Sequence, residues 1–536
     1  MATGDRDRTR PPDADRETYA AARRAAARLT ALEVTAVALT VTDTAGVVRV
    51  KAVPVDRLAD AAVRGVGISP VFDVFTSADA ITATADLGGP DGDLRLVPDL
   101  GRLTVLAAQP GWAWAPADRF DQLGTPHPGC LRHFLRRTTA AAHARGLRVA
   151  MGYETEWVAL RPGPDGHHVP AFDGPAYGMS RLVAASDYLR DIVSALRAQD
   201  VAVRQVHPEY APGQFEVSTA PADPLAAADD VVLVRETVRA VSHAHGLTAA
   251  FAPAIVAGQV GNGCHLHFSL TAAPAGRAGP QAVGAPAGAD EAATGEVTPG
   301  AGGEVAPGEV APGSGNEVAP GTGDEVAPGE SGTAGAVASG AAGPGEAPGG
   351  ELLRGGAGPH GLTPEGEAFL AGVLDALPAL LAVGAPSPAS YLRLGPSRWA
   401  GAYQCWGLEN REAALRLVSG PPGEPGGAHA EVKCCDAAAN PYLLAGAVLA
   451  AGLAGLEAAA RLPAPVRGDP AVNAPGTPRL PRTLTEAADH LAAHDVLRAA
   501  FGPVLHDAVL AVRRAEEEAL AGRSPQDVVA ATLRRY

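Results

Sequence analysis

The sequence predicts an α+β protein with a small β-rich N-terminal domain and a larger domain built around a mostly antiparallel sheet. The first observation is a series of short β-branched runs from Val34 to about residue 115, broken by Gly and Pro turns. The second is the alternation of helical and strand-like patterns after Gly129, which is typical of helices packed against an antiparallel sheet. At 536 residues the chain is long enough for several domains.

The elements follow in order along the chain. Residues 1–15 are charged and predict a disordered tail, and the Ala- and Arg-rich stretch 16–32 predicts the first helix. A turn at 43–46 separates two β-branched runs and predicts a hairpin. We assign 16–120 to the N-terminal domain and 121–536 to the larger one. In the larger domain the predicted helices are 131–145, 179–199, 223–246 and 441–460, and the predicted strands are 148–160, 201–219 and 262–271.

Residues 273–357 interrupt the larger domain. They contain five copies of Glu-Val-Ala/Thr-Pro-Gly in a filler of Gly, Ala, Ser and Thr. The spacing is irregular, and the copies lack the hydrophobic face that a solenoid repeat needs. So few apolar side chains cannot offset the entropy lost on ordering, and the segment predicts a disordered insertion. Folded sequence resumes at Thr363-Pro364, a typical helix N-cap followed by proline.

Composition excludes several classes of protein. The net charge is −16, and without a basic block to neutralise phosphates nucleic acid is excluded as a partner. The five cysteines are scattered and form no CxxC pair, which argues against a disulfide framework. The N-terminus has no apolar signal-peptide core, and the longest apolar run, 443–456, is shorter than the roughly 20 residues that span a bilayer. We therefore expect a cytoplasmic protein that does not interact with membranes.

Acidic residues are concentrated in two of the strand-like segments. Glu154 and Glu156 lie two apart in GYETEW, and side chains two apart share one face of a strand. Glu209 and Glu216 flank a Pro-Gly turn in HPEYAPGQFEV, so both can converge on one site. Neighbouring carboxylates repel unless a cation or a proton lies between them. The alternatives are a solvated strand face for the first pair and an ordinary acidic loop for the second.

A third segment, GNGCHLHFSL, places His265, His267 and Ser269 on one face of a strand. His-x-His is compatible with zinc, but the carboxylates elsewhere favour a hard ion, Mg²⁺ or Mn²⁺. A hydrogen-bonded structural pair of histidines is the alternative. Arginines spaced through apolar sequence between 390 and 440 suit phosphate and carboxylate groups, with surface salt bridges as their alternative.

Together these segments resemble the glutamine synthetase family from about residue 34 to 520, excluding the insertion. The matching motifs, in order, are GYETEW, HPEYAPGQFEV, GNGCHLHFSL, SYLRL, ENREAALR and AEVKCCDAAANPYL. The resemblance implies an N-terminal β-grasp domain, a larger catalytic α/β domain with an antiparallel sheet, and a homo-oligomer of stacked rings, a dodecamer. It also implies an ATP-dependent ligase with two ions, Mg²⁺ or Mn²⁺, in each active site. Such a ligase phosphorylates the side-chain carboxylate of glutamate, and an amine then displaces the phosphate.

The resemblance also implies roles for individual residues. The two metal sites would be Glu156, Glu209 and Glu216 for one, and Glu154, His265 and Glu431 for the other. The ATP-binding residues would be His267, Ser269, Arg411 and Arg416. The substrate-binding residues would be Gly261, Arg393, Lys433 and Trp399. The catalytic residues would be Arg393, Arg411 and Glu431.

The sequence departs from the family pattern where that family binds ammonium. The family presents a flap glutamate six residues after the arginine that matches Arg393, and here Trp399 occupies that position. An Asp-Gly-Ser-Ser loop of the N-terminal domain is also absent. A pocket without these acids but with an indole favours an amine that carries carbon, with a cation–π contact to Trp399. We therefore expect a γ-glutamyl-amide ligase that uses an organic amine, such as an alkylamine, ethanolamine or a polyamine.

Other functions remain open. One is an ordinary ammonia-assimilating glutamine synthetase, and another is a catalytically weak nucleotide- or amine-binding regulator on the same fold. Lys433 and His429 stand where the family has phosphate-contacting arginines, and the loss of the bidentate fork favours slower turnover or a different acid substrate. A zinc hydrolase using His265 and His267 is a third alternative, which the surrounding acids disfavour.

Overall fold

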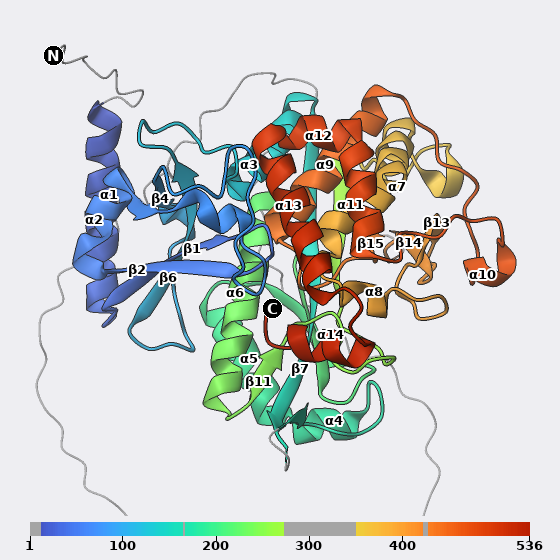
Figure 1. The fold of residues 1–536 in the computed structure, drawn as a ribbon, viewed down its shortest axis with the longest axis horizontal. Coiled ribbons are helices and arrows are strands. Elements are labelled where there is room, and N and C mark those ends of the chain that lie inside the picture. Colours follow the sequence, from blue (N-terminus) through green and yellow to red (C-terminus); the bar gives the residue numbers. More distant parts are fainter. Residues whose placement is uncertain (1–11, 164–166, 273–349, 422–426) are drawn as a thin grey trace, which may run out of the picture. The chain divides into compact units, whose positions relative to one another are not determined.

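The computed structural model describes residues 12–163, 167–272, 350–421 and 427–536 (Figure 1). The predicted tail and insertion fall mostly on residues 1–11 and 273–349, which lie outside the described residues. The first helix begins at Pro12, earlier than the predicted residue 16, so residues 12–15 belong to a helix instead of the tail.

A six-stranded sheet and two helices, α1 (Pro12–Ala31) and α2 (Leu58–Arg64), form the N-terminal part. The strands are β1 (Ala36–Thr42), β2 (Val48–Pro54), β3 (Val66–Ile68), β4 (Leu94–Pro98), β5 (Thr104–Val105) and β6 (Trp112–Phe120). Their spatial order is β2-β1-β6-β4-β3, with β5 also paired to β6. Strands β1 and β2 form the predicted antiparallel hairpin, and Gly46 adopts a φ of 87° in its turn. Val37 and Leu39 alternate with less buried residues and lie in the core, as expected for a half-buried strand.

A larger, nine-stranded sheet organises the rest of the described chain. Its strands are β7 (Leu147–Pro162), β8 (His168–Pro170), β9 (Val203–Pro208), β10 (Gln214–Thr219), β11 (Thr248–Ala250), β12 (Cys264–Ala272), β13 (Tyr403–Leu408), β14 (Ala413–Val418) and β15 (His429–Val432). The order is β13-β14-β15-β12-β7-β10-β9, with β8 and β11 also on β7. The mixed helix-and-sheet fold class is confirmed, with one refinement, because β13 and β14 pair in parallel. Side-chain alternation fixes the two faces of a strand but not the direction of its neighbour.

The described residues after β6 also form twelve α-helices, most of which pack against one face of this sheet. They are α3 (Leu131–Ala144), α4 (Met179–Ala184), α5 (Ser186–Ala198), α6 (Pro224–Ala244), α7 (Pro364–Gly384), α8 (Ser390–Arg393), α9 (Pro441–Glu457), α10 (Pro470–Asn473), α11 (Leu484–Ala493), α12 (Asp495–Phe501), α13 (Pro503–Leu520) and α14 (Pro525–Thr532). Tyr153 and Trp157 of β7 and Leu266 of β12 are buried in a core to which α3, α5, α6, α7, α9, α11, α12 and α13 contribute side chains. The predicted single helix at 179–199 is instead two helices, since the chain leaves helical geometry at Ala185.

Helices α7 and α9 approach closely because small residues line their contact. A Cβ on Gly455 would lie 2.2 Å from the carbonyl oxygen of Ala368, so only glycine fits there. The predicted N-cap of α7 is present, since Thr363 Oγ1 accepts the N–H of Gly366 at 3.0 Å. Helix α7 is long and apolar enough to cross a bilayer, but 83% of its most apolar window is buried inside the structure. It is therefore a core helix, as α9 is.

The insertion ends earlier than predicted. Residues 350–357 extend the fold: the N–H of Leu352 donates to the carbonyl of Leu270 at 3.0 Å, next to the end of β12. Leu352 and Leu353 are only 7% and 2% exposed. Two leucines in a Gly-rich stretch have no periodicity, which is why the sequence pattern does not reveal this segment.

Asn440 links the N-terminal part to helix α9. Its side-chain oxygen accepts the N–H of Leu443 at 3.0 Å, and its amide donates to the carbonyls of Thr42 at 3.1 Å and Asp43 at 3.0 Å. We expect Asn440→Ala to lower the free energy of unfolding by about 2–4 kcal/mol, because it removes a helix cap and two buried hydrogen bonds to backbone carbonyls. Urea unfolding measures this change. Ser524→Ala, which removes only the exposed cap of α14, is the control and should cost about 1 kcal/mol; equal costs would contradict the linking role of Asn440.

Candidate active site

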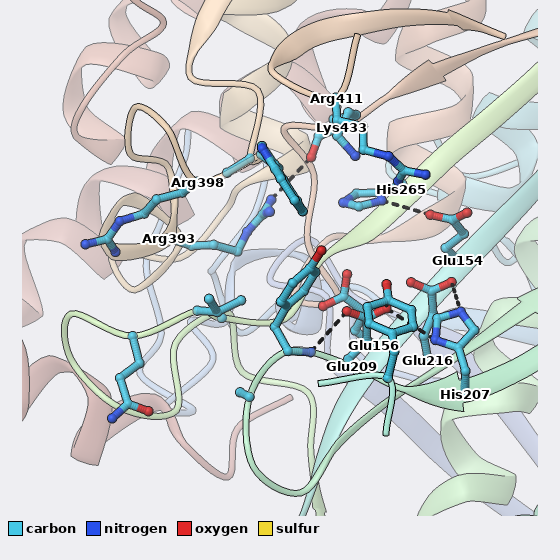
Figure 2. Close-up of a pocket in the computed structure, with 18 of the residues that line it drawn as sticks. Glu154, Glu156, His207, Glu209, Glu216, His265, Arg393, Arg398, Arg411 and Lys433 are labelled. Carbon is cyan, nitrogen blue, oxygen red and sulfur yellow. Dashed lines mark hydrogen bonds and ion pairs between the residues drawn. The ribbon is translucent and has the colours of Figure 1, made fainter. Parts of the chain in front are cut away.

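A cavity of about 1080 Å³ opens on the polar face of the nine-stranded sheet. Its walls come from β7, β9, β10 and β12, from the segments 258–261 and 397–400, and from three cationic residues near β14 and β15. Figure 2 shows the acids and histidines on one side of the cavity and Arg393 and Arg398 on the other. The cavity therefore brings an anionic wall and a cationic wall together around one space.

The first cluster in this cavity is Glu154, His265 and Glu431, whose ligand atoms all lie within 4.8 Å of one another. Antiparallel pairing places Glu154 directly opposite His265, and Glu431 opposite His267. His265 Nδ1 lies 2.9 Å from Glu154 Oε2 and 3.2 Å from Glu431 Oε1. The structure thus brings together the three residues of one metal site that the family resemblance implied.

The electrostatics of this cluster follow from its burial. Burial and the charge of Lys433 oppose protonation of His265, but hydrogen bonds from its ring to Glu154 and Glu431 raise the pKa of His265 to about 9. Burial alone would raise the pKa of Glu431, yet the Lys433 and His265 charges hold it well below its usual range. The histidine thus carries a positive charge that partly compensates the carboxylates.

The second cluster is His207, Glu209 and Glu216, again with ligand atoms within 4.8 Å of one another. His207 Nδ1 lies 3.3 Å from Glu209 Oε1, and His207 Nε2 lies 3.3 Å from Glu216 Oε1. Glu156 lies directly opposite Glu216 in the β7–β10 ladder and lines the same cavity, although it is outside this tight group. The sequence reasoning missed His207, which a two-residue spacing from Glu209 in the HPEY motif could have revealed.

Glu156, beside this cluster, has a raised pKa. Burial, followed by the charges of Glu216 and Glu209, raises its pKa to about 7 despite the nearby His265. One of its oxygens accepts a hydrogen bond from Gln214 Nε2 at 2.7 Å. Several carboxylates converging with two imidazoles form an oxygen-rich donor set, which fits hard divalent ions such as Mg²⁺ or Mn²⁺ better than zinc.

A third cluster of ligand-type residues, Asp118, Cys130 and His133, is a poor cation site. Both oxygens of Asp118 already accept hydrogen bonds, one from Arg132 at 2.9 Å and one from Arg136 at 2.8 Å. A cation there would compete with two guanidinium groups. Burial also raises the pKa of the Cys130 thiol, which disfavours a thiolate ligand.

The cationic residues have defined partners. A terminal nitrogen of Arg393 donates to the carbonyl of Cys435 at 2.7 Å, while its buried Nε has no hydrogen-bond partner among the described residues. Lys433 Nζ lies 2.9 Å from Glu431 Oε1, and Arg416 lies 3.1 Å from the other oxygen of Glu431. Lys433 and Arg416 therefore fix the orientation of Glu431, a role that the sequence did not suggest. Arg411 is exposed and lines the cavity.

The remaining predicted residues lie near the cavity in different ways. Gly261 lines it, and a Cβ there would approach the carbonyl oxygen of Pro253 to 1.8 Å, so the position requires glycine. His267 and Ser269 follow His265 on the same strand but are not among the cavity-lining residues. The ring of His267 lies 5.2 Å from that of His429, between centroids.

Trp399 lies at the cavity and is 50% exposed. Its ring meets that of Tyr210 edge-to-face at 5.5 Å, and Tyr210 meets Tyr177 in the same way at 5.4 Å. Tyr177 stacks on His207 at 5.1 Å, and its hydroxyl donates to Glu209. The resulting aromatic row (His207, Tyr177, Tyr210 and Trp399) borders the second cluster. No sequence pattern indicates Tyr177, which lies in a loop separated along the chain from the acidic motifs.

Comparison with known proteins gives the site a family context. A family model described as the catalytic domain of glutamine synthetase matches residues 128–278 and 347–529, and one described as the glutamine synthetase N-terminal domain matches 21–124. This chain belongs to the glutamine synthetase family. The catalytic-domain match stops at 278 and resumes at 347, so the family pattern skips most of the predicted insertion.

Relatives in this family are named as synthetases and ligases. The γ-glutamylpolyamine synthetase GlnA3 of Streptomyces coelicolor is 46% identical over 517 residues, covering 95% of each chain. The glutamate–methylamine ligase of Methyloversatilis universalis is 26% identical and covers 78% of this chain and 79% of its own. The glutamine synthetase of Methanocaldococcus jannaschii is also 26% identical, covering 84% of this chain and 86% of its own.

Solved structures agree with this grouping. A crystal structure of a glutamine synthase homolog has a TM-score of 0.72 at 30% identity, covering 94% of this chain and 99% of its own. A GmaS/ADP complex has a TM-score of 0.70 at 26% identity, and the match covers 95% of this chain and 99% of that chain. The predicted family, fold class and ligase activity are confirmed. Glutamine synthetase family ligases use ATP and divalent metal ions, and they act on glutamate with an amine or ammonia.

The raised pKa of Glu156 predicts that metal binding releases protons. At pH 7 about half of the Glu156 carboxyl groups carry a proton in the metal-free protein, because that pKa is about 7. Bound Mg²⁺ would displace this proton, so apparent affinity should rise with pH through this window, and His265 should add to the release when it becomes a ligand. Calorimetric titration in buffers of different ionisation enthalpy measures the protons released.

The matched variant is Glu156→Gln, which should release fewer protons at pH 7 than the unmodified protein. Asp489→Asn, an exposed carboxylate distant from the cavity linings, is the control and should release the same number. Binding heats that do not depend on the buffer would contradict the prediction.

Proposed function

We propose that this protein is an ATP-dependent ligase that joins the side-chain carboxylate of glutamate to an organic amine, with a polyamine as the favoured class. The observation that carries the proposal is the aromatic row ending at Trp399, which borders the cavity at the position where the family resemblance implies a flap acid. Aromatic faces bind alkylammonium groups and pack against their methylene chains. The 46% identity to a γ-glutamylpolyamine synthetase supports the same substrate class.

The cation sites of this enzyme would be the two acidic clusters. Glu154, His265 and Glu431 would hold one divalent ion, and Glu156, Glu209 and Glu216, with His207, would hold a second. These ions, Mg²⁺ or Mn²⁺, would neutralise charge on the oxygens of the transferring phosphate. The donor set supports this assignment because carboxylate oxygens predominate in both clusters.

The cationic wall would bind the anionic substrates. Arg393 is buried and fixed by the carbonyl of Cys435, and its unpartnered Nε would donate to a carboxylate of glutamate, beside Gly261. Lys433 keeps Glu431 ionised and oriented. For ATP, we assign Arg411 and Arg416 to the phosphates and His267 with Ser269 to the nucleotide.

The reaction would follow two steps. The γ-phosphoryl group of ATP passes to the side-chain carboxylate of glutamate and gives an acyl phosphate, and the neutral amine then attacks this carbonyl and expels phosphate. Catalysis here consists mainly of positioning and charge neutralisation. We further propose that the chain acts in the cytoplasm as a homo-oligomer of stacked rings.

Amine preference tests the proposed function. Phosphate release from ATP and glutamate should be faster with polyamines than with ammonium, because the aromatic row offers an apolar surface and no flap acid. Trp399→Glu should lower the ratio of kcat/KM for a polyamine to that for ammonium by about tenfold or more. Trp112→Phe, at an exposed tryptophan of β6, is the control and should leave the ratio unchanged. A wide preference for ammonium in the unmodified enzyme would refute the proposal.

Removal of a cluster residue should abolish turnover. We expect His265→Ala and Glu431→Ala each to reduce kcat by at least about a hundredfold, because each removes one side chain from a three-residue cation site. Steady-state measurement of phosphate release at saturating substrates gives kcat, and circular dichroism tests whether the variants remain folded. A folded His265→Ala enzyme with undiminished kcat would exclude this cluster from catalysis.

A further inference from the structure

A second cavity, of about 520 Å³, adjoins the first at the segment 397–399. Ser397, Trp399 and Arg411 line both cavities, so this segment forms a partition between them. The residues that line the second cavity alone come from the end of β13, the 409–412 connection and the segment before α10, together with His360, and they include Glu409, Glu412, Arg467 and Asp469. The proposed function assigns nothing to this space.

Two carboxylates of the second cavity hold the partition in place. Ser397 Oγ donates to Asp469 Oδ2 at 2.6 Å, and the backbone N–H of Trp399 donates to Glu412 Oε1 at 2.7 Å. Ser397 and Trp399 have φ angles of 54° and 53°, which cost non-glycine residues about 1 kcal/mol or more each. The strained segment therefore depends on these two acids for its conformation.

Glu412 also has unused acceptor capacity. It is 5% exposed, and its second oxygen, Oε2, has no hydrogen-bond partner within the described parts of the chain. Burial raises the pKa of Glu412, the hydrogen bond from Trp399 and the charge of Lys433 oppose the rise, and the charge of Asp469 adds to it. A buried carboxylate oxygen without a donor is costly, so this position favours a ligand that brings N–H groups.

Within the described residues, neither the charged side chains of this cavity nor His360 donates a hydrogen bond to Glu412 Oε2. Glu409 is already bonded to Arg416 at 2.8 Å and to Ser419. Arg411 and Arg467 are exposed, and neither is bonded to Glu412 in the structure. An anion in this cavity would meet three carboxylates, whereas an ammonium group would complete the unsatisfied acceptor.

We infer that the second cavity binds the distal ammonium group of a polyamine whose reacting amine lies in the first cavity, with Glu412 and Asp469 as its acceptors. The aliphatic chain would cross the partition along the indole of Trp399. An ammonium group has three donors, enough for both carboxylates at once. This inference rests on the proposed function and adds a specificity subsite to it.

A comparison of two amines tests the subsite. Phosphate release is measured with spermidine and with n-butylamine, which has the same kind of reacting amine but no distal ammonium. Glu412→Gln and Asp469→Asn keep an acceptor for the partition but remove a charge. Each should lower the ratio of kcat/KM for spermidine to that for n-butylamine by about tenfold, equivalent to ~1.4 kcal/mol. Asp489→Asn is the control variant and should keep the ratio of the unmodified enzyme.

The outcomes separate the subsite from the proposed function. An unchanged ratio in both variants overturns the subsite, as does an equal loss for the two amines, which would mean that the acids only position the partition. An unmodified enzyme that uses n-butylamine as well as spermidine retains the proposed function but refutes the subsite. An enzyme that uses neither amine overturns both.

Discussion

The constraint on which the rest of this structure depends is the mutual repulsion of acidic side chains on one face of the nine-stranded sheet. Glu154 and Glu156 share that face through the two-residue period of β7, and antiparallel pairing brings His265 and Glu216 directly opposite them. The opposite face of the same strands carries Tyr153 and Trp157 into a continuous apolar core. Burial of that core offsets the electrostatic cost of the polar face, and the fold can therefore hold several carboxylates close together on it.

The two acidic clusters differ in how far nearby cationic side chains neutralise their carboxylates. The Glu154 cluster is partly neutralised by His265, Lys433 and Arg416. Among the described residues, the ion-pair partner of Glu209 and Glu216 is His207, whose pKa is raised by these acids although burial opposes the rise. The Glu156 carboxyl therefore retains a proton near neutral pH, and a divalent cation has more to contribute at this second cluster than at the first.

The choice of amine substrate also depends on charge, through the segment 397–399 that separates the two cavities. An indole in place of an acid at this position removes a negative charge from the lining of the cavity, yet Glu412 accepts a hydrogen bond from the backbone N–H of Trp399. The carboxylate of Glu412 thus borders the second cavity instead of the first. This arrangement offers few contacts to a compact ammonium ion. A long organic cation, in contrast, can contact both the indole ring and the carboxylates beyond it.

The sequence by itself determined the family, the fold class and the acidic motifs, because strand periodicity fixes which side chains share a face and the order of motifs is specific. It also fixed the caps at Thr363 and Asn440, since capping is a local interaction. Only the tertiary structure decided that His207 joins Glu209 and Glu216, that Lys433 and Arg416 hold Glu431, and that Tyr177 and Tyr210 continue from Trp399. These contacts join residues from separate strands and loops, and their distances depend on strand order and loop path, which no local pattern encodes.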